Sequence, residues 1–487
     1  MANLNIPEPW QATVLENVLL QVVGGGTPSK SRVDYYKGHI PWMSVKDMNK
    51  NVLYDTADHI TQEAVENSST NIIPAGTPII ATRMSLGKIV IASFDSAINQ
   101  DLKALFLPPD ISKGYLIYWY RSIARNIEQL GTGTTVKGIR LEVLKGLDFP
   151  LAPLSEQKVI VETLDTLLAQ VESIQTRLER VPHILKRFRQ SVLAAAVSGK
   201  LTEEWRRENP CDSKEQLKSI KELYPCKPPK SDLAKFHELP ESWSWAFVRE
   251  VGSVQLGRQR APKYHSGSNM RPYLRVANVM EGYIDTSDVM EMDFDTQDFD
   301  RYRLRDGDIL LNEGQSHELV GRPAIFRNEL ENVCFTNTLV RFRPHGSISS
   351  EFSYMLFLSY LKTGRFQEIA SRTVNISHLG AGRFADMEFP FPPFEEQTEI
   401  VRRVEQLFAY ADTIEQQVNQ ALARVNNLTQ SILARAFSGE LTRAWREANP
   451  ELVSGDNSAE ALLARIQAER ATQKKTSTKK SRTAATQ

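Results

Sequence analysis

A segment of thirteen residues occurs twice in the chain, and this repeat restricts the architecture more than any other feature of the sequence. "SGKLTEEWRRENP" at 198–210 returns as "SGELTRAWREANP" at 438–450, with eight identical residues and an offset of 240. The match extends backward without a gap to "FPLAPLSEQ" at Phe149 and "FPFPPFEEQ" at Phe389. The chain therefore contains two copies of a unit, at 149–210 and at 389–450.

Both copies carry apolar residues at alternating spacings of four and three, the heptad pattern of a helix that pairs along a narrow stripe. In the first copy these residues are Ile160, Leu164, Leu167, Val171, Ile174, Leu178, Val181, Leu185, Phe188 and Val192. In the second copy they are Ile400, Val404, Leu407, Ala411, Ile414, Val418, Ala421, Val425, Leu428 and Ile432. The pattern predicts two helices of about 44 residues, roughly 66 Å long, that bury their stripes together. One copy alone would favour an ordinary amphipathic core helix, whereas two copies in phase favour a pair.

Local signals mark the expected ends of these helices. Ser155 follows the Pro-rich "FPLAPL" and is the expected N-cap, with Glu156 and Gln157 in the first turn. Gly199 and Gly439 stand where helix C-caps belong. Pro182 is expected to kink or interrupt the first helix, because proline lacks the N–H that a helix interior uses.

A stretch of different character precedes each helix, at 1–150 and 240–388. Both stretches are rich in β-branched and aromatic residues with turn signals. Three landmarks recur: "PEPWQATVLENV" beside "PESWSWAFVREV", "IPWMSVKDM" beside "RPYLRVANV", and "PAGTPII" beside "RDGDILL". We expect two compact α/β or mostly β domains that share one fold but carry different surfaces.

Within the repeat copies the predicted spacer-helix segments are 151–210 and 389–450, and each is followed by a less regular segment. Residues 211–239 hold the short helical "KEQLKSIKEL" and then a Pro- and Lys-rich linker. Residues 451–487 hold a matching short helix, "AEALLARIQAER", and a basic tail, "KKTSTKKSRTAATQ", which we expect to be disordered. The order domain, helix, linker thus occurs twice, and an approximate twofold axis is expected to relate the halves.

Composition excludes several classes of protein. Equal numbers of Lys+Arg and Asp+Glu, 59 each, mean that any surface for nucleic acid must concentrate its charge locally. Cys211, Cys226 and Cys334 are too few and too isolated for a disulfide framework or a zinc site. Neither a signal peptide nor an apolar run long enough to span a membrane is present in the sequence. We expect a soluble cytoplasmic protein.

Four motifs that would indicate catalysis are incomplete, so we expect no enzyme activity in this chain. "GGGTPSKS" has Ser29 where a phosphate-binding loop needs its second glycine. "SEQK" near Asp148 suggests a nuclease metal site, but the second copy has Thr398 in place of the lysine. "HEL" occurs at His237 and His317 without the second histidine of a zinc helix. "FPFPPF" lacks the amide or carboxylate of the tetrad that acts on an extruded base. We expect neither a catalytic residue nor a metal ligand.

Polar, basic and aromatic residues gather instead in the expected loops of the two variable domains. In the first domain they are Lys30, Arg32, Tyr35, Tyr36, Lys37, Lys46, Arg83, Lys88, Thr134 and Lys137. In the second they are Arg258, Arg260, Lys263, Tyr264, Arg271, Arg275, Asn312, Gln315, Arg322, Arg372, Asn375 and His378. Arg and Lys suit phosphates and guanine edges, and Asn and Gln suit adenine edges. Any one of them fits a solvated surface role as well, so only their grouping predicts a DNA-binding surface.

The sequence resembles the specificity subunit of Type I restriction-modification systems. The resemblance rests on "GGGTPSKSRVDYYKGHIPWMSVKDM", on "FPLAPLSEQKVIVETLD" with "FPFPPFEEQTEIVRRVE", and on "SGKLTEEWR" with "SGELTRAWR". It implies an α+β fold, in which two globular α/β target-recognition domains are separated by two long antiparallel coiled-coil helices. Each domain would recognise half of an asymmetric split DNA site, and the helices would set the gap. In the second domain "QLGRQRAPKYHSGSNMRPYLRV" departs from the Gly-Gly-Thr-Pro form of this loop.

The resemblance also implies partners for a noncatalytic subunit. Two methyltransferase subunits would bind S-adenosylmethionine, two restriction and translocase subunits would use ATP and Mg²⁺, and this chain would bind no cofactor itself. A pseudo-twofold chain offers two equivalent docking surfaces, in which Trp205, Arg206, Trp445 and Arg446 act either in partner docking or in the scaffold. Three alternatives remain open: the subunit of a methylation-only system, a coiled-coil scaffold whose β domains bind proteins, and a self-sufficient nuclease or methyltransferase.

Overall fold

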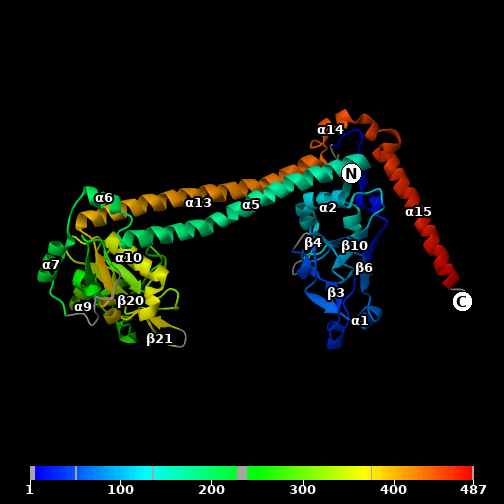
Figure 1. The fold of residues 1–487 in the computed structure, drawn as a ribbon. Coiled ribbons are helices and arrows are strands. Elements are labelled where there is room, and N and C mark those ends of the chain that lie inside the picture. Colours follow the sequence, from blue (N-terminus) through cyan, green and yellow to red (C-terminus); the bar gives the residue numbers. More distant parts are fainter. Residues whose placement is uncertain (1–5, 50–51, 134–135, 228–237, 374–375, 485–487) are drawn as a thin grey trace. The chain divides into compact units, whose positions relative to one another are not determined.

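The computed structural model describes residues 6–49, 52–133, 136–227, 238–373 and 376–484, with 473–484 described by their backbone alone. Two long helices, α5 (Leu154–Val197) and α13 (Phe394–Phe437), have 44 residues each, which confirms their predicted length (Figure 1). The chain divides into two compact units. The first unit comprises residues 1–179 and 420–487, the second comprises residues 180–419, and each long helix contributes to both.

Within each unit, the beginning of one long helix packs with the end of the other. In the first unit Leu164 of α5 shares a buried cluster with Leu433 of α13. In the second unit Val192 of α5 shares a buried cluster with Val404 of α13. The helix segments are therefore antiparallel in both units, and the predicted stripes form much of the buried seam.

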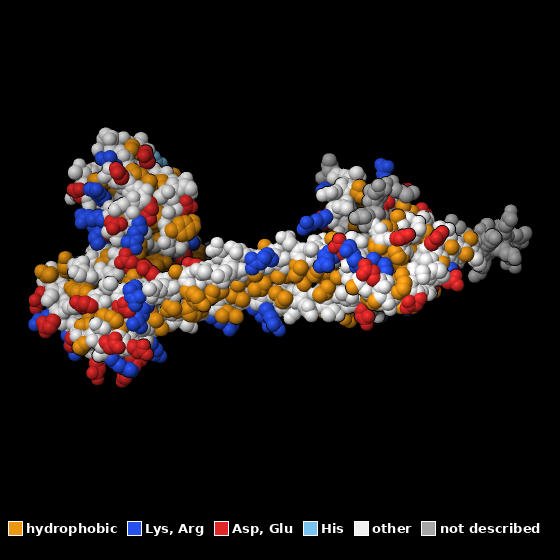
Figure 2. Space-filling model, turned by 90° about the horizontal axis from the view of Figure 1, so that it is seen from above, with side chains coloured by type: hydrophobic (Ala, Val, Ile, Leu, Met, Phe, Trp, Pro, Cys, Tyr) orange, Lys and Arg blue, Asp and Glu red, His pale blue; other side chains and the backbone are white. Residues whose placement is uncertain are grey.

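Burial of the stripe is incomplete. Ile174 and Leu428 belong to the predicted stripes, yet each is 47% exposed. Ile184 and Tyr410, which lie outside the stripes, are 62% and 63% exposed. Figure 2 shows hydrophobic side chains along the surface of these helices. Apolar surface that remains exposed on a helix is typical of a site where another protein packs.

The helix ends agree with the sequence at their C-termini and differ at the N-terminus of α5. Gly199 and Gly439 adopt φ values of 77° and 75°, the left-handed conformation predicted for C-caps. The prediction of Ser155 as N-cap was wrong, because α5 already begins at Leu154. The Gln157 N–H binds the Pro153 carbonyl at 2.9 Å, so the prolines before the helix place its first turn two residues earlier.

Pro182 lies inside α5 without interrupting it, contrary to one of the two predicted outcomes. A proline removes one intrahelical hydrogen bond and crowds the preceding turn. Its side chain is exposed, so no neighbouring core residue has to make room for the ring. The hydrogen bonds of the adjacent turns keep the helix continuous.

The first unit contains two small sheets and a covering helix. One sheet has the order β2 (Gln21–Gly24), β10 (Leu102–Phe106), β7 (Pro78–Ala81), β8 (Ile89–Ala92) and β4 (Val52–Leu53). The other has the order β5 (Asp58–Ile60), β3 (Ile40–Met43), β9 (Ser96–Ile98) and β6 (Asn71–Ile73). Helix α2 (Lys113–Ser122) supplies Tyr115 and Trp119 to a core that also contains Leu105 of β10 and Leu164 of α5.

The second unit repeats this arrangement with different residues. Its sheets have the orders β13 (Gly252–Leu256), β20 (Leu339–Pro344), β16 (Ile309–Asn312), β18 (Pro323–Ile325) and β15 (Met290–Asp293), β14 (Met270–Leu274), β19 (Cys334–Phe335). Helix α10 (Ser350–Thr363) takes the place of α2 (Figure 1). The predicted landmarks fall on matching strands, β3 with β14 and β7 with β16, and β3–β9 and β14–β19 are both parallel pairs. The two domains therefore share one fold, as predicted.

A short strand pair closes each domain next to its long helix. Strand β1 (Gln11–Val14) pairs with β11 (Asp148–Leu151), and β12 (Ser244–Phe247) pairs with β23 (Glu388–Phe391). The structure also contains these short helices: η1 (Leu15–Val18), η2 (Val33–Tyr36), η3 (Val45–Asp47), α1 (Gln62–Glu66), α3 (Ala124–Leu130), α4 (Leu141–Lys145), α6 (Glu203–Glu208), α8 (Val248–Val251), η5 (Pro262–Tyr264), α9 (Thr296–Tyr302), α11 (Arg365–Ile369), α12 (Ala381–Ala385), α14 (Arg443–Ala448), η6 (Pro450–Leu452) and η7 (Gly455–Asn457).

Both short helices predicted after the repeat copies are present, and the second is longer than predicted. Helix α7 (Ser213–Leu223) confirms the short helix predicted at "KEQLKSIKEL", and its Leu217 and Ile220 are buried in the core of the second unit. Helix α15 (Ala459–Ala484) extends through most of the tail that we expected to be disordered. The four lysines of residues 474–484 are good helix formers, but the three threonines and two serines are weak ones, so local propensity does not account for the length of α15. None of the described helices is long and apolar enough to cross a membrane.

Candidate nucleic-acid interface

The doubled "LT..WR" motif forms a buried carboxylate cluster in each unit. In the first unit Glu156 has no exposed surface and accepts hydrogen bonds from Trp10 Nε1 at 2.8 Å, Thr442 Oγ1 at 2.6 Å and Arg446 Nε at 3.0 Å. The Arg446 guanidinium also lies 5.7 Å from the centre of the Trp10 ring. Every oxygen of the buried carboxylate is thus paired, as burial of a charge requires.

The second unit contains the same cluster built from the other copy of each motif. Glu396 is fully buried and accepts from Trp243 Nε1 at 2.9 Å, Thr202 Oγ1 at 2.7 Å and Arg206 Nε at 3.0 Å. Arg206 lies 5.7 Å from the centre of the Trp243 ring. Arg206 and Arg446 are therefore tied to the interior of their units, which favours the scaffold role of the two predicted for them.

Trp205 and Trp445 have a different setting from the arginines beside them. Both side chains are half-exposed, and neither is a member of the buried clusters in the described part of the chain. Their backbone carbonyls accept hydrogen bonds from the Asn209 and Asn449 side chains at 2.9 and 2.7 Å. The rings remain accessible to a partner, so the docking role stays a prediction.

The predicted DNA-binding residues of the first domain converge in part on one concave surface. A cavity of about 730 Å³ is lined by Lys30, Tyr36 and Lys46. A second cavity of about 280 Å³ is lined by Arg83 and shares Gln100 and Asp101 with the first. We call these two adjoining cavities the first recognition surface.

Two loops form one side of this surface. The hairpin between β7 and β8 carries Arg83, which forms a β-bridge with Gly138 of the loop between α3 and α4. The Lys137 carbonyl accepts a hydrogen bond from the Met84 N–H at 3.0 Å, so the two loops hold each other. The Lys137 side chain is exposed. Thr134 lies outside the described residues.

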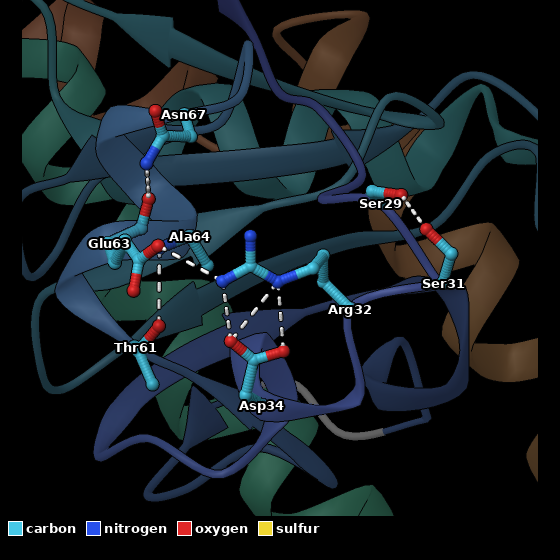
Figure 3. Close-up of polar contacts among 8 residues, drawn as sticks. All are labelled: Ser29, Ser31, Arg32, Asp34, Thr61, Glu63, Ala64 and Asn67. Carbon is cyan, nitrogen blue, oxygen red and sulfur yellow. Dashed lines mark hydrogen bonds and ion pairs between the residues drawn. The ribbon is translucent and has the colours of Figure 1, made fainter.

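Arg32, Lys37 and Lys88 are exposed but line neither cavity. Arg32 Nη2 pairs with Asp34 at 2.7 Å and with Glu63 at 3.2 Å (Figure 3). The hydrogen bond between Arg32 and Asp34 raises the pKa of Arg32 and lowers the pKa of Asp34. Its charge is already balanced by two carboxylates, and Tyr35, 6% exposed, packs in the core beneath it. A DNA contact by Arg32 stays a prediction.

In the second domain, the equivalent loops form a small sheet. Strands β17 (Gly314–Gln315), β22 (Ser377–His378) and β21 (Ser371–Arg372) pair in that order and bring together Gln315, Arg372 and His378. His378 Nδ1 lies 3.1 Å from Glu313 Oε2. The pairing of Gly314 with His378 matches the bridge of Arg83 with Gly138 in the first unit. We call this sheet the second recognition surface; Asn375, which falls in its loop, lies outside the described residues.

Asn312 and Arg322 lie beside this surface but differ in accessibility. Asn312 ends strand β16 opposite Leu339 and has no exposed surface. Neither its amide oxygen nor its amide nitrogen has a hydrogen-bond partner among the described residues. In this conformation Asn312 does not reach a base, because the strand turns its side chain into the protein. Arg322 is half-exposed.

The loop with the departing sequence keeps the backbone path of its counterpart. A Cβ on Gly25 would lie 1.9 Å from the Ile98 carbonyl oxygen, and a Cβ on Gly257 would lie 2.2 Å from the Thr336 carbonyl oxygen. Only glycine permits these close approaches. One glycine of the first-domain form is therefore retained in the second domain, and it fixes the loop there.

Several predicted residues of the second domain are tied to their own domain. Arg258 is 7% exposed, pairs with Asp298 at 2.7 Å and stacks 3.8 Å from the centre of the Tyr264 ring, so its prediction as a DNA contact conflicts with its burial. Hydrogen bonds from Lys263 and Arg258 lower the pKa of Tyr264. The other four lie over or beside local partners: Arg260 over Tyr273, Lys263 over Tyr264, Arg271 over Phe299 and Arg275 beside Asp288.

Sequence reasoning missed much of the lining of the first recognition surface, including Met84, Asn99, Gln100 and Arg140. Asn99 and Gln100 directly follow strand β9, and the Gln100 side chain accepts a hydrogen bond from Thr27 of the glycine-rich loop. A signal for them was present, since "NQD" at 99–101 has the polar counterpart "TNT" at 336–338. The sequence does not show that β9 pairs with β3, and this pairing places the residues after β9 beside the glycine-rich loop.

The motifs weighed for catalysis have structural roles. The "GGGTPSKS" loop leads into the short η2 rather than a helix whose amides wrap a phosphate. Glu156 of "SEQK" is enclosed in its cluster, and His317 Nδ1 lies 3.3 Å from Ser377 Oγ. His237 lies outside the described residues. No group of three metal-ligating side chains occurs among the residues that the structure describes.

The chain thus contains two copies of one domain, and matching loops form the recognition surface of each copy. Comparison with known proteins identifies the class: residues 7–183 and 240–424 match the family described as Type I restriction modification DNA specificity domain. The chain belongs to this family.

Named relatives cover almost the whole chain. It is 34% identical to the EcoKI specificity subunit of Escherichia coli strain K12, over 98% of this chain and 99% of the relative. It is 33% identical to the StySPI specificity subunit of Salmonella potsdam, again over 98% and 99%. The solved HsdS subunit of Thermoanaerobacter tengcongensis has the same fold, with a TM-score of 0.53 and 16% identity over 89% of this chain and 98% of that one.

Proposed function

We propose that this chain is the noncatalytic DNA-recognition subunit of a Type I restriction-modification complex, and that each unit recognises one half of a bipartite asymmetric site. One observation carries the proposal: the same pair of loops forms the recognition surface of both units but presents different side chains. The first surface offers Arg83 and Gln100, and the second offers Gln315, Arg372 and His378. A conserved scaffold with diverged loops suits two unlike half-sites.

The residue types on both surfaces suit duplex DNA. Lys30 and Lys46 are exposed cations for phosphates, and Lys46 is held by Asp58 at 3.1 Å. Gln100 carries an exposed amide that matches an adenine edge, whereas Arg83 matches a guanine edge. Each base contact is worth roughly 1–3 kcal/mol of discrimination.

We also propose two methyltransferase subunits as partners, docked on the repeated scaffold. Exposed apolar side chains on the long helices, Ile184 and Tyr410 among them, and the half-exposed Trp205 and Trp445 support a docking surface. S-adenosylmethionine would be bound by those subunits, and ATP and Mg²⁺ by restriction subunits where the system has them, with no cofactor on this chain.

Methylome sequencing of cells that express single variants tests the half-site assignment. Arg83→Ala and Lys137→Ala should relax or weaken recognition in one half of the methylated site, and Arg322→Ala and Gln315→Ala in the other half. Arg125→Ala, an exposed cation on α3 that lines neither cavity, is the control. Equal loss across both halves from a change in one unit contradicts the proposal.

Purified chain without partners tests the noncatalytic role. We expect neither cleavage with Mg²⁺ and ATP nor transfer of a labelled methyl group from S-adenosylmethionine. Turnover by the pure chain would show that the subunit is an enzyme.

A further inference from the structure

Met84 holds an unusual backbone conformation at the tip of the hairpin between β7 and β8. Its φ is 60°, and the Ser85 N–H binds the Arg83 carbonyl at 2.7 Å, which makes Met84 the centre of a positive-φ γ-turn. This turn is rare and strained in L-residues. The other described non-glycine residues with positive φ are Asn328 and Asn332, and asparagine tolerates this region far better than methionine.

The neighbouring loop maintains the strained turn. The Met84 N–H donates to the Lys137 carbonyl at 3.0 Å, and Arg83 pairs with Gly138 next to it. The Met84 side chain gains no burial in exchange, because it is 59% exposed. Backbone strain that is not offset by burial of the side chain is typical of residues at functional sites.

Met84 shares the first recognition surface with the groups suited to DNA. It lines the 730 Å³ cavity together with Lys30, Lys46 and Gln100. Val33 lines the same cavity and is 64% exposed. A base edge that reaches Gln100 therefore meets an apolar surface beside the hydrogen-bonding groups.

We infer that Met84 is a specificity-determining residue that contacts the 5-methyl group of a thymine in one half-site; the inference rests on the proposed function. In the major groove the thymine methyl is the apolar feature among hydrogen-bonding edges. A purine at that position would place its N7 acceptor against the thioether side chain and leave it without a partner, and cytosine would lack the methyl group. Met84 thus selects thymine by contact and disfavours purines by desolvation.

The second unit supports a role in discrimination rather than in folding. Counted from the matched strands β7 and β16, the residue at this position is Gln315. Gln315 lies in a regular strand pair with Ser377, so the shared fold does not require the γ-turn. At the position of Met84 and Gln315 the two units differ in backbone conformation and in side-chain polarity, as expected of surfaces that recognise different half-sites.

A double-mutant cycle tests the contact. The full chain is assembled with its methyltransferase subunits, and its binding is measured on DNA duplexes that contain the site found by methylome sequencing. In a series of these duplexes, each thymine of the site is replaced in turn by deoxyuridine. At one position the loss of the methyl group should weaken wild-type binding about fourfold. Met84→Gly and Met84→Asn, which suit the left-handed backbone, should show no weakening there, and Met84→Leu should retain it.

Val143→Ala, an exposed apolar residue on α4 outside both cavities, is the matched control and should keep the wild-type response. Equal melting temperatures of the variants establish that all are folded. The inference is overturned if no deoxyuridine weakens wild-type binding, if Met84→Gly remains sensitive at the same position, or if it loses affinity equally for every duplex. Absence of any site preference in the wild type would instead refute the proposed function.

Discussion

Replacement of Arg446 by methionine should strongly destabilise the first unit. Glu156 has no exposed surface and Arg446 is only 11% exposed, so water does not replace the lost guanidinium at the carboxylate. Trp10 and Thr442 would remain as neutral donors to a buried charge. Loss of one member of a buried ion pair costs about 3–5 kcal/mol. Glu156→Gln should cost less, about 1–3 kcal/mol, because the Arg446 guanidinium that loses its carboxylate is partly exposed and still donates to the Gly439 carbonyl.

Urea unfolding followed by tryptophan fluorescence measures these changes in the free energy of unfolding. Arg443→Met, an exposed arginine on the same helix α14, is the control and should shift stability by less than about 0.5 kcal/mol. The double variant Arg446→Met/Glu156→Gln should recover part of the loss. If Arg446→Met unfolds like the control, or if the two single effects simply add, the carboxylate cluster does not stabilise the unit as argued.

Three further predictions concern other parts of the chain. Four residues inserted after Leu178 lengthen the helix by about 6 Å. Methylome sequencing should then find both half-sites retained with one more unspecified base pair between them. An active mutant that still methylates sites with the original number of base pairs between the half-sites contradicts this prediction. Gly25→Ala places a Cβ 1.9 Å from a main-chain oxygen and should lower the melting temperature, whereas Gly382→Ala meets nothing within 4 Å and should not. Burial raises the pKa of Cys334 to about 12, so iodoacetamide at pH 8 should label the exposed Cys226 and spare Cys334 until the protein unfolds.

The long-range features of this fold could be predicted because they repeat. The heptad stripes and the doubled glycines gave the length of both helices and their C-caps, and the strand landmarks gave one fold for two domains. The N-terminus of α5 was misplaced because Pro153 and Ser155 both fit a helix start, and only the main-chain bond to the Pro153 carbonyl decides between them. Helix α7 was predicted from its local sequence, whereas the burial of Leu217 and Ile220 was not, because it depends on a core distant in sequence.

The candidate site was less predictable, for a physical reason. An exposed arginine in a loop has the same sequence signature whether it faces DNA or its own carboxylates. Arg83 lies 3.7 Å from Asp101 but remains 63% exposed and lines a cavity, whereas Arg32 pairs with Asp34 and Arg258 is buried against Tyr264. The exposure that each arginine keeps depends on how its loop folds, and residue types alone do not encode it.

The crossed arrangement of the clusters explains why the repeat motifs occur in pairs. Glu156 belongs to the first copy, but its partners Thr442 and Arg446 belong to the second, and Glu396 is paired in turn by Thr202 and Arg206. A single copy would bury a carboxylate without its cation, which is strongly unfavourable. Neither copy can therefore lose its motif without destabilising a unit that contains the other copy's helix start. The loops that carry Met84 and Gln315 lie outside both clusters. They are free to diverge toward different DNA half-sites, while the paired glutamates hold the scaffold that presents them unchanged.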